Sequence, residues 1–127
     1  MREIKFRAWD KLTKTMIQNY CYMENGFRFH GYDLTNNTHY IDAVMQYTGL
    51  KDKNGKEIYE DDIIRVTDDI CLDPGHHVDF RVVFKNGAFV GDEVGKTKDA
   101  WYYVDWPSQY FDNCEIIGNI YENPELV

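Results

Sequence analysis

Residues on which common enzyme mechanisms and metal sites depend are scarce in this chain. Ser108 is the only serine among the 127 residues, and no Gly-x-Ser-x-Gly elbow surrounds it, so a serine hydrolase is not expected. The three cysteines, Cys21, Cys71 and Cys114, show no C-x-x-C spacing, which argues against both a disulfide framework and a thiolate zinc site. The glycines are scattered singly and do not form a phosphate-binding loop. We therefore expect no metal, no cofactor and no enzymatic activity.

Long hydrophobic runs are also missing. No apolar stretch approaches the roughly 20 residues that a membrane-spanning helix needs, and the charged residues Arg2, Glu3 and Lys5 stand where a signal peptide would become apolar. Hydrophobic residues nevertheless make up 43% of the chain and aromatic residues 16%, which favours a packed core over disorder. These features predict a soluble, cytoplasmic protein without a membrane partner.

Charge is distributed unevenly. The net charge is -8; residues 1–44 carry six Lys or Arg against five Asp or Glu, whereas residues 45–127 carry eight against seventeen. An acidic surface of this kind repels phosphate backbones, so we expect no direct nucleic-acid binding. The acidity has three interpretations: plain solvation of a small domain, an acidic binding face, or carboxylates within residues 52–79 that imitate the phosphates of a nucleic acid.

The hydrophobic pattern predicts an all-β fold made of short strands. Alternating, β-branched and aromatic stretches indicate strands in residues 3–10, 16–17, 20–23, 27–32, 78–84, 88–91, 100–106 and 114–121. Residues 39–50 fit either a strand or a short helix, and their β-branched and aromatic residues favour the strand. The pairs Asn25-Gly26 and Asn86-Gly87 are typical of tight hairpin turns. Pro107 indicates a break and Gly118 a bulge or bend.

Three sequence blocks identify a family. "KFRAWD" (residues 5–10), "YTGLKDKNGKEIYE" (47–60) and "IIGNIYENPEL" (116–126) closely resemble the YopX family of phage and prophage proteins. The resemblance implies a protein of bacterial phage or prophage origin with an SH3-type β-barrel in residues 45–127, onto which an N-terminal β-hairpin subdomain, residues 1–44, would pack. It implies no established activity.

The most acidic stretch of the chain follows the Lys-Asn-Gly turn in the middle block. Calcium binding by an EF-hand loop is excluded on spacing, because a loop that starts at Asp52 has its glycine, Gly55, at position 4 and Ile63 at position 12. Asp52 is expected instead to form an Asx-type turn. Cys71, His76, His77 and Asp79 contain metal-ligating atoms, but no second pair at zinc spacing follows them.

We interpret Tyr59, Glu60, Asp61 and Asp62 as a turn between two strands. Asp61 stands where the family pattern has glycine, so we expect a positive φ there, with Asp61→Gly neutral or slightly stabilising. At least one of Glu60 and Asp62 should accept main-chain hydrogen bonds while the remaining carboxylates face water. A ligand or divalent-ion role for the four residues is the alternative.

A second candidate surface is aromatic. Six aromatic residues gather in the segment 101–111, namely Trp101, Tyr102, Tyr103, Trp106, Tyr110 and Phe111. On a strand they cover both faces, so part of this surface either contacts a partner or is covered by the N-terminal sheet. The candidate binding residues are therefore Tyr59, Glu60, Asp61, Asp62, Trp101, Tyr103 and Trp106.

Three functions follow from these sites. The first is a non-enzymatic module that binds a protein, either a second copy of itself as a homo-oligomer or a host protein. The second is an acidic nucleic-acid mimic that occupies a host DNA-binding or defence protein. The third is a carboxylate-dependent enzyme, which would require a pocket that holds carboxylates with raised pKa values.

Overall fold

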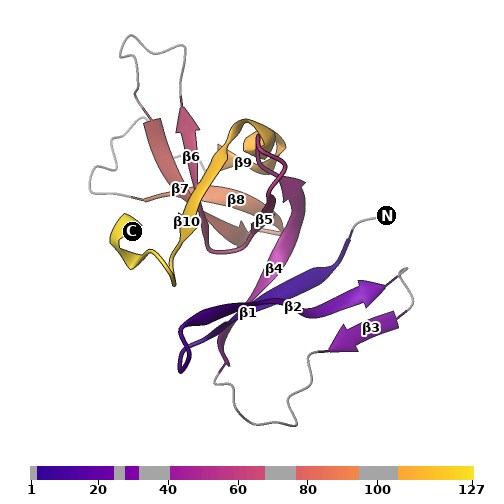
Figure 1. The fold of residues 1–127 in the computed structure, drawn as a ribbon. Helices are drawn as coiled ribbons and strands as arrows, with labels where there is room; N and C mark the ends of the chain where they lie inside the picture. Colours follow the sequence, from indigo (N-terminus) through magenta and orange to yellow (C-terminus); the bar gives the residue numbers. More distant parts are fainter. Residues whose placement is uncertain (1–2, 25–27, 32–40, 68–76, 95–105) are drawn as a thin grey trace.

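Two five-stranded antiparallel sheets make up the described part of the protein (Figure 1). The computed structural model describes residues 3–24, 28–31, 41–67, 77–94 and 106–127. The first sheet has the strand order β3-β2-β1-β4-β5. Its strands are β1 (Lys5–Asp10), β2 (Thr15–Glu24), β3 (Arg28–Gly31), β4 (Ile41–Lys51) and β5 (Glu57–Tyr59).

The second sheet has the strand order β10-β6-β7-β8-β9. Its strands are β6 (Asp62–Thr67), β7 (His77–Lys85), β8 (Ala88–Glu93), β9 (Trp106–Pro107) and β10 (Glu115–Asn119). Two short 3-10 helices, η1 (Ser108–Asn113) and η2 (Pro124–Leu126), flank β10. No helix within the described ranges is long and apolar enough to cross a membrane.

The expected hairpins are confirmed. β1 pairs with β2 and β2 with β3, and the stretch that includes residues 41–51 is a strand. In the β7–β8 hairpin, Asn86 and Gly87 have φ angles of 52° and 82°, as expected for a two-residue turn that matches the right-handed twist of its strands. The bulge expected at Gly118 is also present, because the register of β10 against β6 shifts between Ile116 and Gly118.

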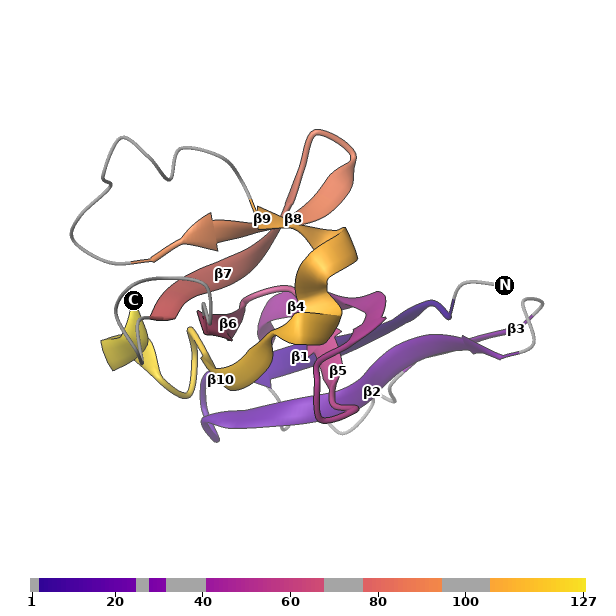
Figure 2. The ribbon, with the colours of Figure 1, turned by 90° about the horizontal axis from the view of Figure 1, so that it is seen from above.

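The all-β fold class is therefore confirmed, while the finer expectation of an SH3-type barrel is not. The described strands form two open sheets and no closed barrel. In Figure 1, β4 runs from its place beside β1 toward the second sheet, and Figure 2 shows β7 and β8 on one side of the molecule and β1 and β2 on the other. The domain boundary expected between residues 44 and 45 falls inside β4, and the division into two domains stays a prediction.

The main hydrophobic core lies within the second sheet and the elements beside it. Its buried members are Ile58, Ile64, Phe80, Val82, Phe89, Phe111 and Cys114. Phe80 and Val82 stand at alternating positions of β7, as a strand with one buried face requires. A second contact region joins the two sheets, where Trp9 of β1 stacks on Tyr121 with ring centroids 5.7 Å apart.

Candidate functional site

The turn between β5 and β6 has the backbone that the sequence predicts. Asp61 has a φ of 69°, in the left-handed region that glycine and, less readily, Asp and Asn adopt. Its own main chain is fixed on both sides: its N–H donates to the carbonyl of Val82 at 2.8 Å, and its carbonyl accepts from the N–H of Ile120 at 3.1 Å. The turn is therefore tied to β7 and to the segment after β10.

The carboxylates of this turn are all bound within the protein. Glu60 Oε1 accepts the N–H of Gln46 at 2.8 Å, and Asp62 Oδ2 accepts the N–H of Tyr59 at 2.8 Å, which confirms the expected main-chain hydrogen bonds. The expectation that the remaining carboxylates face water is wrong. Asp61 Oδ1 accepts Nε and Nη2 of Arg81 at 3.0 and 2.8 Å, and its Oδ2 accepts the hydroxyl of Tyr121 at 3.2 Å.

A buried ion pair links the two sheets at this turn. Arg7 of β1 and Asp62 of β6 are only 5% and 2% exposed, and Arg7 Nη2 lies 2.9 Å from Asp62 Oδ1. Burial raises the pKa of Asp62, although the charge of Arg7 and the N–H of Tyr59 oppose that change. The guanidinium also lies 4.8 Å from the ring centroid of Tyr59. The charge of Asp62 therefore depends on an arginine 55 positions earlier in the chain.

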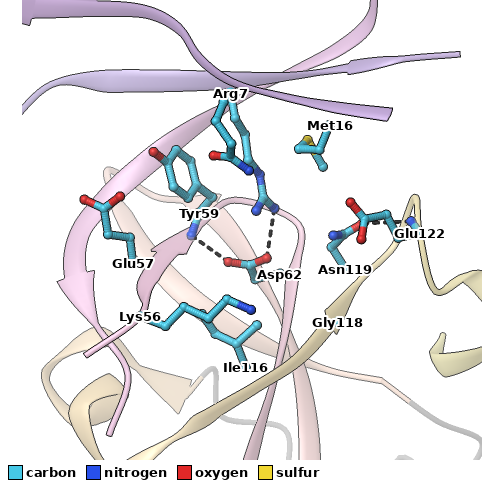
Figure 3. A pocket seen from close by; sticks show the side chains of 11 residues that line it. Arg7, Met16, Lys56, Glu57, Tyr59, Asp62, Ile116, Gly118, Asn119 and Glu122 are labelled. Atoms are coloured by element: carbon cyan, nitrogen blue, oxygen red, sulfur yellow. Dashed lines mark hydrogen bonds and ion pairs between the residues drawn. The ribbon is translucent and has the colours of Figure 1, made fainter. Parts of the chain in front are cut away.

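A cleft of about 350 Å³ opens beside this ion pair, between the two sheets (Figure 3). The first sheet contributes residues from β1, β2 and the start of β5, and the second sheet contributes residues from β6 and β10. The lining residues are Arg7, Met16, Gln18, Lys56, Glu57, Tyr59, Asp62, Ile116, Gly118, Asn119 and Glu122.

Asn119 fixes the wall of the cleft that belongs to the second sheet. Its Oδ1 accepts the main-chain N–H groups of Tyr121 and Glu122 at 3.0 and 2.8 Å. This hydrogen-bonding pattern caps the turn that follows β10, in the way that asparagine side chains commonly do. The side chain is 7% exposed and lines the cleft.

Tyr59 lies on the opposite wall and is neutral over the physiological pH range. Burial raises the pKa of its phenol to about 12, and the nearby carboxylate of Glu57 acts in the same direction. Glu57 itself forms an ion pair with Lys5 of β1. The aromatic ring therefore offers the cleft an apolar wall next to charged groups that already have partners.

The sequence-predicted binding residues separate into four groups. Tyr59 and Asp62 line the cleft, whereas Glu60 and Asp61 support the turn beneath it. Trp106 packs in the core of the second sheet, with its ring centroid 5.6 Å from that of Phe80. Trp101 and Tyr103 lie outside the described residues.

Arg7 and Asn119 are site residues that the sequence analysis missed. Strand alternation did put Arg7 on the same face as Trp9, and a charged residue that shares a buried face with tryptophan usually has a partner there. For Asn119 the signal was weaker, because asparagine after a strand is equally typical of an ordinary turn.

Metal ligation was also considered for this part of the chain. Where the structure describes the chain, no three His, Cys, Asp or Glu side chains come together in a group that could hold a metal ion. Asp79 is bound by Arg65, with Nε and Nη2 donating to its two oxygens at 2.8 and 3.1 Å. Cys71 and His76 lie outside the described residues.

Comparison with known proteins identifies a family and a similar solved structure. The family model described as YopX protein matches residues 5–127. A solved structure, the crystal structure of protein EF1440 from Enterococcus faecalis, shares 28% sequence identity with this chain and has a TM-score of 0.60. That match covers 97% of this chain and 96% of the other chain. No curated protein matches.

Proposed function

This chain belongs to the YopX family, and we propose that it is a non-enzymatic module that binds a protein partner in the cleft between its two sheets. The observation that carries the proposal is the cleft itself, with its volume of about 350 Å³ and walls from two sheets. Clefts of a few hundred Å³ with an apolar wall and a few placed polar groups are typical binding sites. This volume suits one inserted side chain and its neighbours.

The contacts of Asp62 favour binding over catalysis. Its raised pKa and its position in a cleft meet the condition set above for a carboxylate-dependent enzyme. However, Oδ1 accepts from Arg7 and Oδ2 accepts from Tyr59. A general base needs an oxygen within reach of the proton that it removes, and both oxygens here are engaged in holding the two sheets together.

A nucleic-acid mimic gains no support from the geometry. Such a mimic needs carboxylates that project freely from the surface. Each carboxylate that the structure describes between residues 52 and 79 accepts a hydrogen bond or forms an ion pair inside the molecule: Asp52, Glu57, Glu60, Asp61, Asp62 and Asp79.

We also propose that residues 45–127 are a variant of the SH3-like barrel, in a phage or prophage protein that acts in the bacterial cytoplasm. The strand order β10-β6-β7-β8-β9 supports the barrel. Along the chain, β6 to β9 form a meander in which each strand pairs with the next. The 3-10 helix η1 follows, and the last strand, β10, returns to pair with β6. Cross-strand NOEs that join β4 and β5 to the sheet of β6–β10 in a continuous ring would support the barrel, and the absence of these NOEs would contradict it.

Site-specific photo-crosslinking in a bacterial host tests the binding function. A photoreactive phenylalanine analogue replaces Gln18, which is exposed and lines the cleft, or Lys11, which is exposed in the β1–β2 turn and does not line the cleft. We expect a covalent adduct at position 18 and none at position 11. An adduct of twice the chain's mass would indicate self-association.

The captured protein is then purified and titrated against the unmodified chain. Saturable binding with a defined stoichiometry supports the proposed function. Equal adducts at positions 11 and 18, or no adduct at position 18, contradict binding in the cleft.

A further inference from the structure

Hydrogen-bond donors in the cleft are open, whereas most acceptors are occupied. Asn119 Oδ1 already accepts two main-chain N–H groups, and this fixes the orientation of the amide, because only its oxygen can accept them. The amide nitrogen, Nδ2, therefore remains as a donor. It has no hydrogen-bond partner among the described residues.

Arg7 supplies a second open donor on the facing sheet. Its Nη2 donates to the carbonyl of Glu60 at 3.1 Å and to Asp62 at 2.9 Å, and its Nε contacts the sulfur of Met45 at 3.4 Å. The other terminal nitrogen, Nη1, has no partner within the described chain. Neither Arg7 Nη1 nor Asn119 Nδ2 is among the fully buried polar atoms that lack a partner, so solvent reaches both atoms. Both residues line the cleft.

Acceptors that could hold a cation are already engaged on the inner part of the cleft. Both oxygens of Asp62 accept hydrogen bonds, Glu57 is paired with Lys5, and Asn119 Oδ1 accepts twice. At the exposed rim, Lys56 and Glu122 carry opposite charges. The inner cleft is thus close to neutral, and its unused groups are donors.

We propose that this cleft binds a side-chain carboxylate of the protein partner, with Arg7 Nη1 and Asn119 Nδ2 as the donors from the two sheets. The inference rests on the proposed protein-binding function. Hydrogen bonds from a guanidinium to a carboxylate are charge-assisted and stronger than those to a neutral carbonyl. Lys56 at the rim adds an attractive charge for an approaching acidic residue. Figure 3 shows Arg7 and Asn119 reaching the cleft from opposite sides.

The test is an NMR titration with three single-residue probes. The ¹⁵N-labelled full chain is titrated with the N-acetyl amides of glutamate, glutamine and lysine. We expect the glutamate probe to shift the side-chain NH₂ signals of Asn119 and the main-chain signals of the cleft. The glutamine probe should bind at least about tenfold more weakly, as the loss of one charge-assisted hydrogen bond predicts, and the lysine probe should not shift these signals.

Asn119→Asp removes the donor while it keeps the acceptor for Tyr121 and Glu122. The cap on the turn is retained, so the fold should survive, and binding of the glutamate probe should fall by at least about tenfold. Asn113→Asp is the matched control, because it makes the same charge change at an exposed position of η1 outside the cleft. It should bind the probe as the wild type does.

Four results would overturn the inference: no shift with glutamate, equal binding of glutamate and glutamine, cleft shifts with lysine, or undiminished glutamate binding by Asn119→Asp. The comparison of the three probes on the wild type stands even if the variant does not fold. If a partner is crosslinked at position 18 but any of these four results is obtained, the protein-binding function is supported and only the proposed recognition of a carboxylate is wrong.

Discussion

At the scale of single residues, neighbouring carboxylates perform different tasks. Asp61 shapes the turn and is bound at the surface by Arg81 and Tyr121, while Asp62 forms a buried ion pair with Arg7. Burial of two charges is costly, and their mutual attraction offsets that cost only while both partners are present. The two sheets therefore depend on the integrity of this pair more than on any single surface contact.

Asp62→Ala should destabilise the protein by about 3–5 kcal/mol, because it leaves the buried guanidinium of Arg7 without its counter-charge. The double variant Arg7→Met, Asp62→Leu should cost clearly less than Asp62→Ala, since neither charge remains buried. Urea unfolding followed by tryptophan fluorescence gives both values. A single variant within about 1 kcal/mol of the wild type would mean that the pair contributes little.

Asp61→Ala should destabilise the protein by about 1 kcal/mol more than Asp61→Gly. Both variants lose the contacts to Arg81 and Tyr121, but alanine retains the cost of a left-handed backbone at a φ of 69° that glycine does not pay. The sequence alone predicted a neutral or stabilising glycine. Because both variants lose the hydrogen bonds of the Asp61 side chain to Arg81 and Tyr121, we expect both to be less stable than the wild type. Thermal melts of the two proteins at neutral pH decide the order, and equal melting temperatures would contradict it.

At the scale of elements, close packing inside the second sheet limits one glycine. A Cβ atom added at Gly91 of β8 would lie 2.9 Å from Cβ of Phe80 and 3.0 Å from Cβ of Trp106. Gly91→Ala should therefore cost about 1–3 kcal/mol through overpacking. Gly87→Ala serves as the comparison, because nothing lies within 4 Å of its added Cβ, and the cost there is about 1 kcal/mol of backbone strain.

Circular dichroism melts and one-dimensional NMR spectra distinguish the two glycine variants. Gly91→Ala should shift the aromatic and methyl signals of the core around Trp106, whereas Gly87→Ala should change only signals of the hairpin turn. Unchanged core signals in Gly91→Ala would show that β8 and β9 are less tightly packed than this geometry requires.

The loop between β4 and β5 is held by one carboxylate with a pH-dependent charge. Burial acts to raise the pKa of Asp52, but hydrogen bonds from the main-chain N–H groups of Ile116, Lys56 and Asn54 outweigh it and lower the pKa below its ordinary value. The folded protein thus binds the proton of Asp52 more weakly than the unfolded chain does. Its contribution to stability is complete above about pH 4 and is lost as the pH falls below that value.

Asp52→Asn should cost about 1–3 kcal/mol at neutral pH, because an amide cannot accept all three N–H groups. The wild type should then lose more stability between about pH 5 and about pH 3 than Asp52→Asn does. Urea midpoints at the two pH values measure this difference. Asp112→Asn, at an exposed position of η1, is the control and should behave as the wild type. The same acid sensitivity in Asp52→Asn and the wild type would contradict the assignment.

The sequence predicts local structure well here and distant partners poorly. Strand periodicity, the Asn86-Gly87 turn and the bulge at Gly118 are encoded within a few neighbouring residues, whereas the positive φ of Asp61 is expected from the glycine that the family pattern has there. The partner of Asp62 lies 55 positions away, and no local pattern specifies that distance. The same limit applies to Asn119, because its place in the cleft depends on residues of β1 and β2 that lie about 100 positions earlier in the chain.

At the scale of the whole molecule, side-chain contacts connect the two sheets. Arg7 and Trp9 of β1 contact Asp62 and Tyr121 on the second sheet, and β4 pairs with β1 before it leads into the turn toward β6. The cleft exists only where the sheets meet, so the proposed binding function requires both. The sequence predicts a boundary between residues 44 and 45, and the contacts across it lead us to expect a single cooperative unfolding step.

Deleting residues 1–44 should therefore abolish cooperative folding of residues 45–127. The fragment would carry Asp62 buried without Arg7, would leave Tyr121 without the ring of Trp9, and would remove the β1 partner of β4. For the full chain, urea transitions followed by far-UV circular dichroism and by fluorescence should coincide in one step. The fragment should show a poorly dispersed NMR spectrum and no sharp transition.

Asp62→Leu in the fragment removes the unpaired charge and should recover part of the fragment's stability, since the desolvation cost of that charge then disappears. A fragment that unfolds cooperatively with most of the full chain's stability would show that the sheets are independent domains, and two separate transitions in the full chain would show the same.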